Sequence, residues 1–344
     1  MHIWKGMDKM DAFYAHRRYV AGVDGGGTKT ACMIADDRGT LLAYAVAEGS
    51  NHQISGFALT LENVCCAINE ACAQAGIQWE ELAYIYLGMA GADSQEDCEL
   101  LNQGFASAFG GIPFKVDNDE WKAFACEAKQ GWGAVSICGT GANLAVKDLA
   151  GKVYTVRARR YILGNYGGGN HLAEMALHHA FRCDEHTGPD TRLAEVLPAY
   201  CGCADMEELA RQVYQSGYQY YKNYNIPKLV FDLAWQGDEV CRGLLTEMGG
   251  QLGTMLGRQI RHVGLEDTEI PVVLAGSQYA KDTHGLMIGP LEKVLRSYVP
   301  RASLCVVQCP PVVGAILSAL EELEVELDDT CRLQLQMQAQ AGSV

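Results

Sequence analysis

The chain carries one glycine-rich hairpin pattern twice, in copies that lie 112 residues apart. The two segments are "GVDGGGTKTACMIADDRGTLLAYA" (22–45) and "AVSICGTGANLAVKDLAGKVYTVR" (134–157). Each reads as an apolar strand, a Gly/Thr turn, a second strand, an Asp-x-x-Gly turn and a third strand, followed by helical sequence. A single register aligns Gly27 with Gly139, Thr28 with Thr140, Asp36 with Asp148 and Gly39 with Gly151. Four matches in one register indicate a duplication, so we expect two similar α/β halves.

The first copy fits neither of the common phosphate-loop motifs. A Walker loop requires lysine where this chain has Thr28, and G-x-G-x-x-G requires glycine where it has Thr30. Both motifs also require a helix after the loop, whereas a strand follows here. Glycine N–H groups and a threonine hydroxyl can still bind phosphate oxygens from such a turn. For one loop a purely conformational role is an equal alternative; two duplicated loops favour a nucleotide site between the halves.

A second, shorter pair of similar segments supports the duplication. The segments "AYIYLGMAGA" (83–92) and "IPVVLAGSQYA" (270–280) each read as a strand that ends in a glycine turn. We therefore expect each half to contribute a second glycine turn at a strand end.

Length and charge limit the class of protein. With 344 residues the chain is long enough for two domains. A net charge of −15 argues against a nucleic-acid partner, which would need a basic face. No apolar stretch is long enough to span a membrane, and "MHIWKGMDKMDAFYAHRR" at the start lacks the apolar core of a signal peptide. We expect a cytoplasmic protein without a nucleic-acid or membrane partner.

The cysteines and histidines raise the question of zinc. Fourteen cysteines are scattered without a C-x-x-C pair, which favours reduced, mostly buried thiols. One cluster combines ligand types that zinc uses: His178, His179, Cys183, His186, Cys201 and Cys203. Its spacing matches no standard finger, and "LAEMALHHAFR" reads as an amphipathic helix, so a structural role is favoured over zinc.

Five segments occur in the order of a known nucleotide site: "DGGGTKT", "NDEWKAF", "ICGTGAN", "VLAGS" and "PPVVGA". Together they resemble the actin-like sugar-kinase superfamily, and most closely the BadF-type ATPase and N-acetylglucosamine kinase family. The resemblance runs from Tyr19 to Leu323, and "EGSNHQISG" (48–56) adds a segment that contacts sugar in those kinases.

The resemblance implies an α/β fold of two RNase-H-like, actin-like ATPase domains with a nucleotide and sugar cleft between them. The first domain comprises 19–123 and a returning helix at 312–326, where Ile316, Leu317, Leu320 and Leu323 share one face. The second comprises 124–311; residues 1–18 form an extension and 327–344 a tail. The polar alternation of "LQLQMQAQAGSV" (333–344) suggests that this end frays. A homodimer is the family expectation.

The resemblance also assigns roles, with ATP and Mg²⁺ as cofactors. Asp24 is similar to the acid that orients hydrated Mg²⁺, and Asp119 to the base; a turn-forming aspartate and a solvated cluster of helix-start acids are the alternatives. The expected ATP-binding residues are Gly25, Gly26, Gly27, Thr28, Lys29, Thr30, Gly139, Thr140, Gly141, Gly276 and Ser277. The expected sugar-binding residues are Asn51, Asp119, Ala142, Asn143 and Asn165.

One region departs from the family pattern. The kinases usually carry Gly-Gly-Trp-Gly and then Gly-Asp-Glu-Gly-Ser, whereas this chain has "VRARRYILGNYGGGN". Arg159 stands in place of the tryptophan, Asn165 in place of an acid that holds sugar hydroxyls, and Ala142 where serine is common. The phosphate-binding residues are retained, so the departure concerns the acceptor.

Three functions are compatible with the resemblance. The leading prediction is an ATP-dependent kinase of an N-acetylated amino sugar, N-acetylglucosamine or N-acetylmuramic acid, with O6 as the accepting hydroxyl. The alternative is an activator that couples ATP hydrolysis to a partner protein, as other family members do with an iron–sulfur cluster. A catalytically silent sugar sensor is disfavoured because Asp24, Thr28 and Asp119 are retained.

Overall fold

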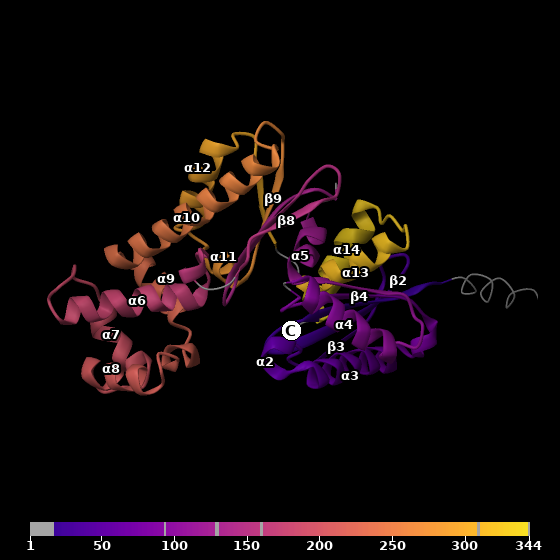
Figure 1. Ribbon diagram of the computed structural model, residues 1–344, viewed down its shortest axis with the longest axis horizontal. Helices are drawn as coiled ribbons and strands as arrows, with labels where there is room; N and C mark the ends of the chain where they lie inside the picture. Colours follow the sequence, from indigo (N-terminus) through magenta and orange to yellow (C-terminus); the bar gives the residue numbers. More distant parts are fainter. Residues whose placement is uncertain (1–16, 93, 128–130, 159–160, 308–309, 343–344) are drawn as a thin grey trace, which may run out of the picture. The chain divides into compact units, whose positions relative to one another are not determined.

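The computed structural model describes residues 17–92, 94–127, 131–158, 161–307 and 310–342. The chain divides into two compact units. Unit 1 comprises Met1–Glu127 and Gln308–Val344, and unit 2 comprises Ala128–Val307. Each unit contains one five-stranded sheet (Figure 1).

The sheet of unit 1 has the strand order β3-β2-β1-β4-β5. The strands are β1 (Tyr19–Gly25), β2 (Lys29–Asp36), β3 (Leu41–Glu48), β4 (Leu82–Met89) and β5 (Phe114–Asn118). Strand β2 runs antiparallel to β1 and β3, whereas β4 and β5 run parallel to β1 and to each other. The first two strands are almost fully buried, as expected of apolar runs between two helical layers.

Unit 2 repeats this topology. Its strands are β6 (Gly133–Cys138), β7 (Ala142–Lys147), β8 (Val153–Thr155), β9 (Pro271–Ala275) and β10 (Ser303–Val306). The order β10-β9-β6-β7-β8 is that of unit 1 read from the other edge, again with an antiparallel second strand. The two predicted glycine-turn strands, β4 and β9, take the same place beside the first strand of each sheet.

The Asp-x-x-Gly turns repeat in atomic detail. In unit 1 the Asp36 carboxylate accepts from the N–H groups of Arg38 and Thr40. In unit 2 the Asp148 carboxylate accepts from the corresponding N–H groups, those of Ala150 and Lys152. The predicted duplication is therefore confirmed.

The helices of unit 1 cover its sheet. They are α2 (His52–Ser55), α3 (Phe57–Ala75), α4 (Gln95–Ala108), α5 (Asp119–Glu127), α13 (Pro311–Glu322) and α14 (Asp329–Gly342). Helix α3 buries Val64, Ile68 and Ala71, which recur at helical spacing, against β2 and β3. It ends where Gly76 takes a left-handed conformation.

Helix α13 returns to unit 1 and packs closely against β1 and α5. An added Cβ at Gly22 would lie 2.5 Å from the backbone N of Ile316, and one at Gly314 would lie 1.6 Å from the backbone O of Lys122. Glycine is required at both contacts because a side chain would overlap the backbone. The helix ends at Glu322, before the predicted end at 326, and Glu324 has a positive φ of 56°.

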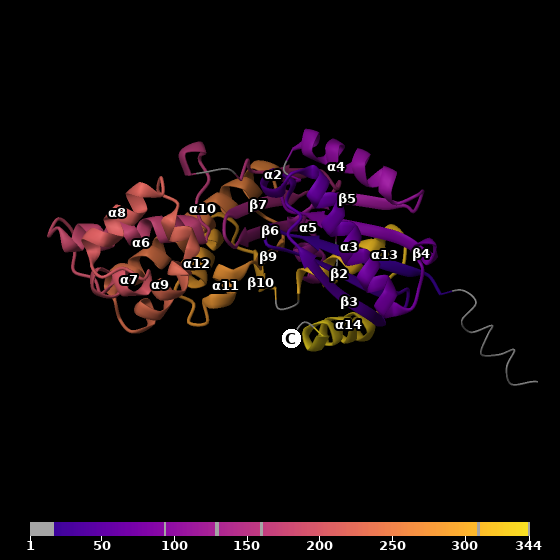
Figure 2. The same ribbon diagram turned by 90° about the horizontal axis from the view of Figure 1, so that it is seen from below.

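The fraying suggested by the sequence of the C-terminal end is wrong for residues 333–342, which belong to helix α14 (Asp329–Gly342). Helix α14 packs against β3 and also contacts α13 within unit 1 (Figure 2). The buried Leu335 and Ala339 are four residues apart and share a helix face, which the alternating polar pattern concealed. Arg332 donates to the carbonyl of Ala125 at 2.8 Å, so a cation lies at the C-terminal end of α5.

Unit 2 adds a group of helices to its sheet. They are α6 (Gly169–Asp184), α7 (Leu193–Tyr200), α8 (Met206–Gln215), α9 (Ile226–Trp235), α10 (Glu239–Val263), α11 (Ser277–Lys281) and α12 (Ile288–Tyr298). Both views show α6 to α9 as one group, while α10 packs along α12 (Figure 2). Asp238 caps α10 and accepts hydrogen bonds from the Thr191 hydroxyl and from the N–H of Cys241. Burial raises the pKa of the Asp238 carboxyl, but its hydrogen bonds lower that pKa by more, so it lies below its usual value.

Candidate functional site

The glycine loop of unit 1 joins β1 to β2 in a turn closed by its own backbone. The N–H of Gly26 donates to the carbonyl of Lys29 at 3.0 Å. The carbonyl of Gly26 accepts from the N–H of Ser50 at 2.9 Å, which fixes the loop to the segment after β3. Gly27, Thr28 and Lys29 are exposed at the tip. The loop thus presents these residues, as the phosphate-binding prediction requires.

Thr30 supports the loop from inside the fold. Its side chain is fully buried, and its hydroxyl lies 2.7 Å from both the Glu48 carbonyl and the Ser50 hydroxyl. The hydroxyl is therefore engaged in joining β2 to the end of β3. This arrangement distinguishes Thr30 from the exposed Thr28, although both were predicted to bind ATP.

Asp24 lies at the end of β1 and has a partner that the sequence did not predict. Its carboxylate forms an ion pair with the ammonium group of Lys122, from α5. The Lys122 side chain is 4% exposed and that of Asp24 is 21% exposed. Lys122 also donates to the Gly88 carbonyl at 3.2 Å, so the cation joins β1, β4 and α5.

Asn51 caps the short helix α2 and directly follows Ser50, which is hydrogen-bonded to the glycine loop of unit 1. Its side-chain oxygen accepts from the N–H of Gln53 at 2.9 Å. The next residue, His52, contacts Asp97 at 2.8 Å. Although burial raises the pKa of Asp97, hydrogen bonds from Ser94 and His52 hold it below its usual value. A hydrogen-bonded network therefore supports the predicted sugar contact.

Asp119 is the first residue of α5, directly after β5. Its side chain lies outside the described residues, and its role as base stays a prediction. Its neighbour Asp117 accepts from the Tyr86 hydroxyl at 3.0 Å and from the N–H of Asn118 at 2.9 Å. Asp117 thus serves the fold of the strand end.

The second loop, Gly139 to Gly141, is held by backbone donors in unit 2. The N–H groups of Gly169 and Asn170, at the start of α6, donate to the carbonyls of Gly139 and Thr140 at 2.8 and 3.0 Å. Thr140 and Gly141 remain exposed. A Cβ at Gly168 would lie 2.5 Å from the backbone of Gly141, so only glycine permits this approach.

Gln278 is a second residue that the sequence analysis missed. It is buried, and its amide donates to the Gly139 carbonyl at 3.2 Å. It follows Gly276 and Ser277, both exposed at the start of α11. Gly276 has a φ of 109° and packs against the carbonyl of Cys138, so the predicted adenosine turn lies beside the predicted phosphate loop.

Two of the predicted sugar residues of unit 2 are joined by a hydrogen bond. The side-chain amide of Asn165 donates to the carbonyl of Ala142 at 2.8 Å. Asn143 accepts from the N–H of Leu144 through its own side-chain oxygen at 2.8 Å. The three residues therefore occupy one region beside the second loop. Arg159 and Arg160 lie outside the described residues.

The departure from the family pattern produces an aromatic cluster. The rings of Tyr166 and His171 lie 4.4 Å apart, and Tyr161 lies 5.0 Å from His171. Burial lowers the pKa of His171, and its Nδ1 accepts from the N–H of Gly167 at 3.2 Å. This hydrogen bond holds the glycine turn after Asn165.

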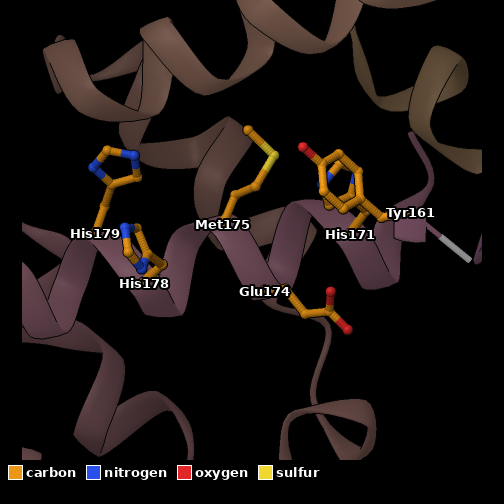
Figure 3. Close-up of a pocket in the computed structure, with 6 residues that line it drawn as sticks. All are labelled: Tyr161, His171, Glu174, Met175, His178 and His179. Atoms are coloured by element: carbon orange, nitrogen blue, oxygen red, sulfur yellow. The ribbon is translucent and has the colours of Figure 1, made fainter. Parts of the chain in front are cut away.

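Beside this cluster lies a pocket of about 220 Å³ on the surface of α6. Figure 3 shows its lining residues, Tyr161, His171, Glu174, Met175, His178 and His179. The rings of His178 and His179 are nearly perpendicular, at 88°. In the described part of the chain, no group of three His, Cys, Asp or Glu side chains could hold a metal ion. Cys201 and Cys203 are buried.

Within the described ranges, none of the helices combines the length and apolar character needed to cross a membrane.

Known proteins resemble this chain over most of its length. A sequence model of the BadF/BadG/BcrA/BcrD ATPase family matches residues 21–319. The chain is 27% identical over 311 residues to an N-acetyl-D-glucosamine kinase from Dictyostelium discoideum, covering 87% of this chain and 97% of that one. It is 23% identical over 307 residues to an N-acetylmuramic acid/N-acetylglucosamine kinase from Clostridium acetobutylicum, covering 89% of this chain and all (100%) of that one.

A solved structure shares the fold. A ROK family glucokinase from Streptomyces griseus, in complex with glucose and AMPPNP, matches with a TM-score of 0.55 at 17% identity. The likeness covers 88% of this chain and 98% of that one. This likeness and the repeated strand order confirm the predicted fold class, two α/β domains of the actin-like type. Because the family match takes in both glycine loops and helix α5, the chain belongs to the BadF/BadG/BcrA/BcrD ATPase family.

Proposed function

We propose that the protein is an ATP-dependent kinase that transfers the γ-phosphoryl group to O6 of an N-acetylated amino sugar. The observation that carries the proposal is the duplicated glycine loop, present at one strand end in each unit. In unit 1 the segment bearing Asn51 and the helix bearing Asp119 are both joined to this loop region. The amino-sugar kinases among the relatives support the same acceptor class.

The chemistry requires neutralised phosphates and an aligned hydroxyl. In the proposed mechanism, Gly25 to Gly27, Thr28 and Lys29 bind phosphate from unit 1, and Thr140 and Gly141 bind it from unit 2. Asp119 accepts the proton of the sugar hydroxyl, whose oxygen forms a bond to the γ-phosphorus. The bond from that phosphorus to the oxygen of the β-phosphate breaks, and ADP leaves.

Asp24 is the residue that would hold Mg²⁺. Its carboxylate is partly exposed at the end of β1, which fits an ion held through water by a single protein oxygen. When bound, the ion neutralises charge on the phosphates. The other proposed contacts are those of the predicted adenosine and sugar residues: Gly276, Ser277, Asn51, Ala142, Asn143 and Asn165. Cytoplasmic location and a homodimer stay predictions.

An acceptor panel tests the proposal. We expect ADP release from Mg–ATP to rise at least tenfold when N-acetylglucosamine or N-acetylmuramic acid is added, because a kinase needs an acceptor in place of water. Glucose and buffer alone serve as controls. ADP release that is equal with and without every sugar would instead support the activator that couples hydrolysis to a partner protein.

A second prediction concerns which amino sugar is preferred. A carboxylate at position 165 would repel the acidic lactyl group of N-acetylmuramic acid, whereas Asn165 does not. We expect Asn165→Asp to lower kcat/KM for N-acetylmuramic acid about tenfold more than for N-acetylglucosamine, the scale of one close like-charge contact. The measurement is kcat/KM for both sugars in the natural protein and the variant.

Two results would contradict this prediction. Equal losses for both sugars would mean that Asn165 merely weakens sugar binding, and an absence of turnover with N-acetylmuramic acid in the natural protein would remove its premise. Glu174→Gln, which changes a carboxylate in the pocket on α6, is the control and should leave the ratio of the two kcat/KM values unchanged.

A further inference from the structure

Lys122 is a buried cation at the nucleotide end of β1 that none of the assigned roles explains. Its side chain is 4% exposed, and its ammonium group forms an ion pair with Asp24 across 98 residues of sequence. A buried ammonium group is costly unless it is paired and hydrogen-bonded. Here the Asp24 carboxylate and the Gly88 carbonyl provide those partners.

Two glycines, on β4 and α13, leave room for Lys122. A Cβ at Gly88 would lie 2.7 Å from Cδ of Lys122, so the absence of a side chain on β4 leaves room for the lysine stem. A Cβ at Gly314 would lie 1.6 Å from the Lys122 carbonyl oxygen, so α13 packs directly on the lysine backbone. The lysine therefore reaches Asp24 through a narrow, fixed path.

We propose that Lys122 is a positioning residue that holds the Asp24 carboxylate in the orientation that suits the nucleotide's metal ion. The inference rests on the proposed function of Asp24. It also concerns the helix of the predicted base, because Lys122 and Asp119 both belong to α5. Through one ion pair, the helix that carries the predicted base is tied to the strand that carries the metal-binding acid.

This role differs from a direct phosphate contact. A lysine that binds phosphate itself would strengthen nucleotide binding with or without Mg²⁺. A lysine that acts through Asp24 strengthens binding only when Mg²⁺ is present, since Asp24 serves the ion. The two roles are separated by measuring affinity under both conditions.

The experiment uses calorimetric titration of AMPPNP into the full chain without sugar, once with Mg²⁺ and once with EDTA. We expect Lys122→Met to weaken binding about tenfold with Mg²⁺, the scale of one charge-assisted hydrogen bond, and to change it less than twofold with EDTA. Lys115→Met is the matched control. Lys115 forms an exposed pair with Glu322 at 2.8 Å, and its loss should leave both affinities unchanged.

A double substitution adds a second readout. In an Asp24→Asn background, Lys122→Met should have no further effect on Mg²⁺-dependent affinity, because its target carboxylate is absent. Equal weakening with Mg²⁺ and EDTA, tighter Mg²⁺-dependent binding, or lowered thermal stability with unchanged affinity would each overturn the inference. If Asp24→Asn does not fold, the comparison of Mg²⁺ with EDTA decides alone. The sugar panel is independent of this assay, so the kinase proposal and the Lys122 proposal fail separately.

Discussion

Asp119→Asn should lower the turnover of sugar by about 10²–10⁴ while nucleotide affinity stays within about twofold, the loss typical of a positioned general base. Asparagine retains the shape of aspartate but cannot accept the proton of the sugar hydroxyl. The measurement is kcat with saturating sugar and Mg–ATP, together with the Kd for AMPPNP.

The neighbouring acid supplies the matched control for this substitution. Asp117 also lies at the β5–α5 junction, but its carboxylate accepts from the Tyr86 hydroxyl and the N–H of Asn118. Asp117→Asn should therefore retain turnover within about tenfold, since it alters only structural hydrogen bonds and a partly exposed ion pair with Lys115 at 3.8 Å. If Asp119→Asn kept near-normal phosphorylation, or if both variants lost turnover equally, the assignment of Asp119 as base would be wrong.

Gly314→Ala should reduce both stability and turnover, although residue 314 has no assigned contact with a ligand. The added Cβ would lie 1.6 Å from the Lys122 carbonyl, so α13 and α5 must separate. We expect a loss of about 1–3 kcal/mol in the free energy of unfolding, as for other overpacked cores. Turnover should fall about 10²-fold, because α5 carries the predicted base and small misplacements have effects of this size.

A helical glycine with free space provides the control for this effect. Gly243 lies on the exposed side of α10, and a Cβ built there meets no atom within 4 Å. Gly243→Ala should stabilise the protein by about 0.4–1 kcal/mol by restricting the unfolded chain. Chemical denaturation and kcat measured on both variants test the pair. If Gly314→Ala kept the stability and turnover of the natural protein, the close packing of α13 on α5 at Gly314 would not be required.

Much of the fold follows from short stretches of sequence. The apolar runs around Gly25–Thr30 and Gly139–Gly141, with their Asp-x-x-Gly turns, predict two copies of one three-stranded unit, and both copies are present. These features are local, because strand alternation and turn conformation depend on neighbouring residues. Helix α14 was missed because Leu335 and Ala339 become a buried pair only when the helix packs against the rest of unit 1.

The residues of the candidate site also fall into those that the sequence predicts and those that only the folded structure reveals. Motif order and loop composition are visible along the chain, so they identify the family, the two glycine loops and the candidate acids Asp24 and Asp119 without a structure. Two contacts become visible only in the folded chain: Lys122 pairs with Asp24, and Gln278 supports the loop at Gly139. Their partners lie 98 and 139 residues away in sequence. No local pattern encodes such contacts, because they form only when α5 packs on β4 and α13, and when α11 packs on β6.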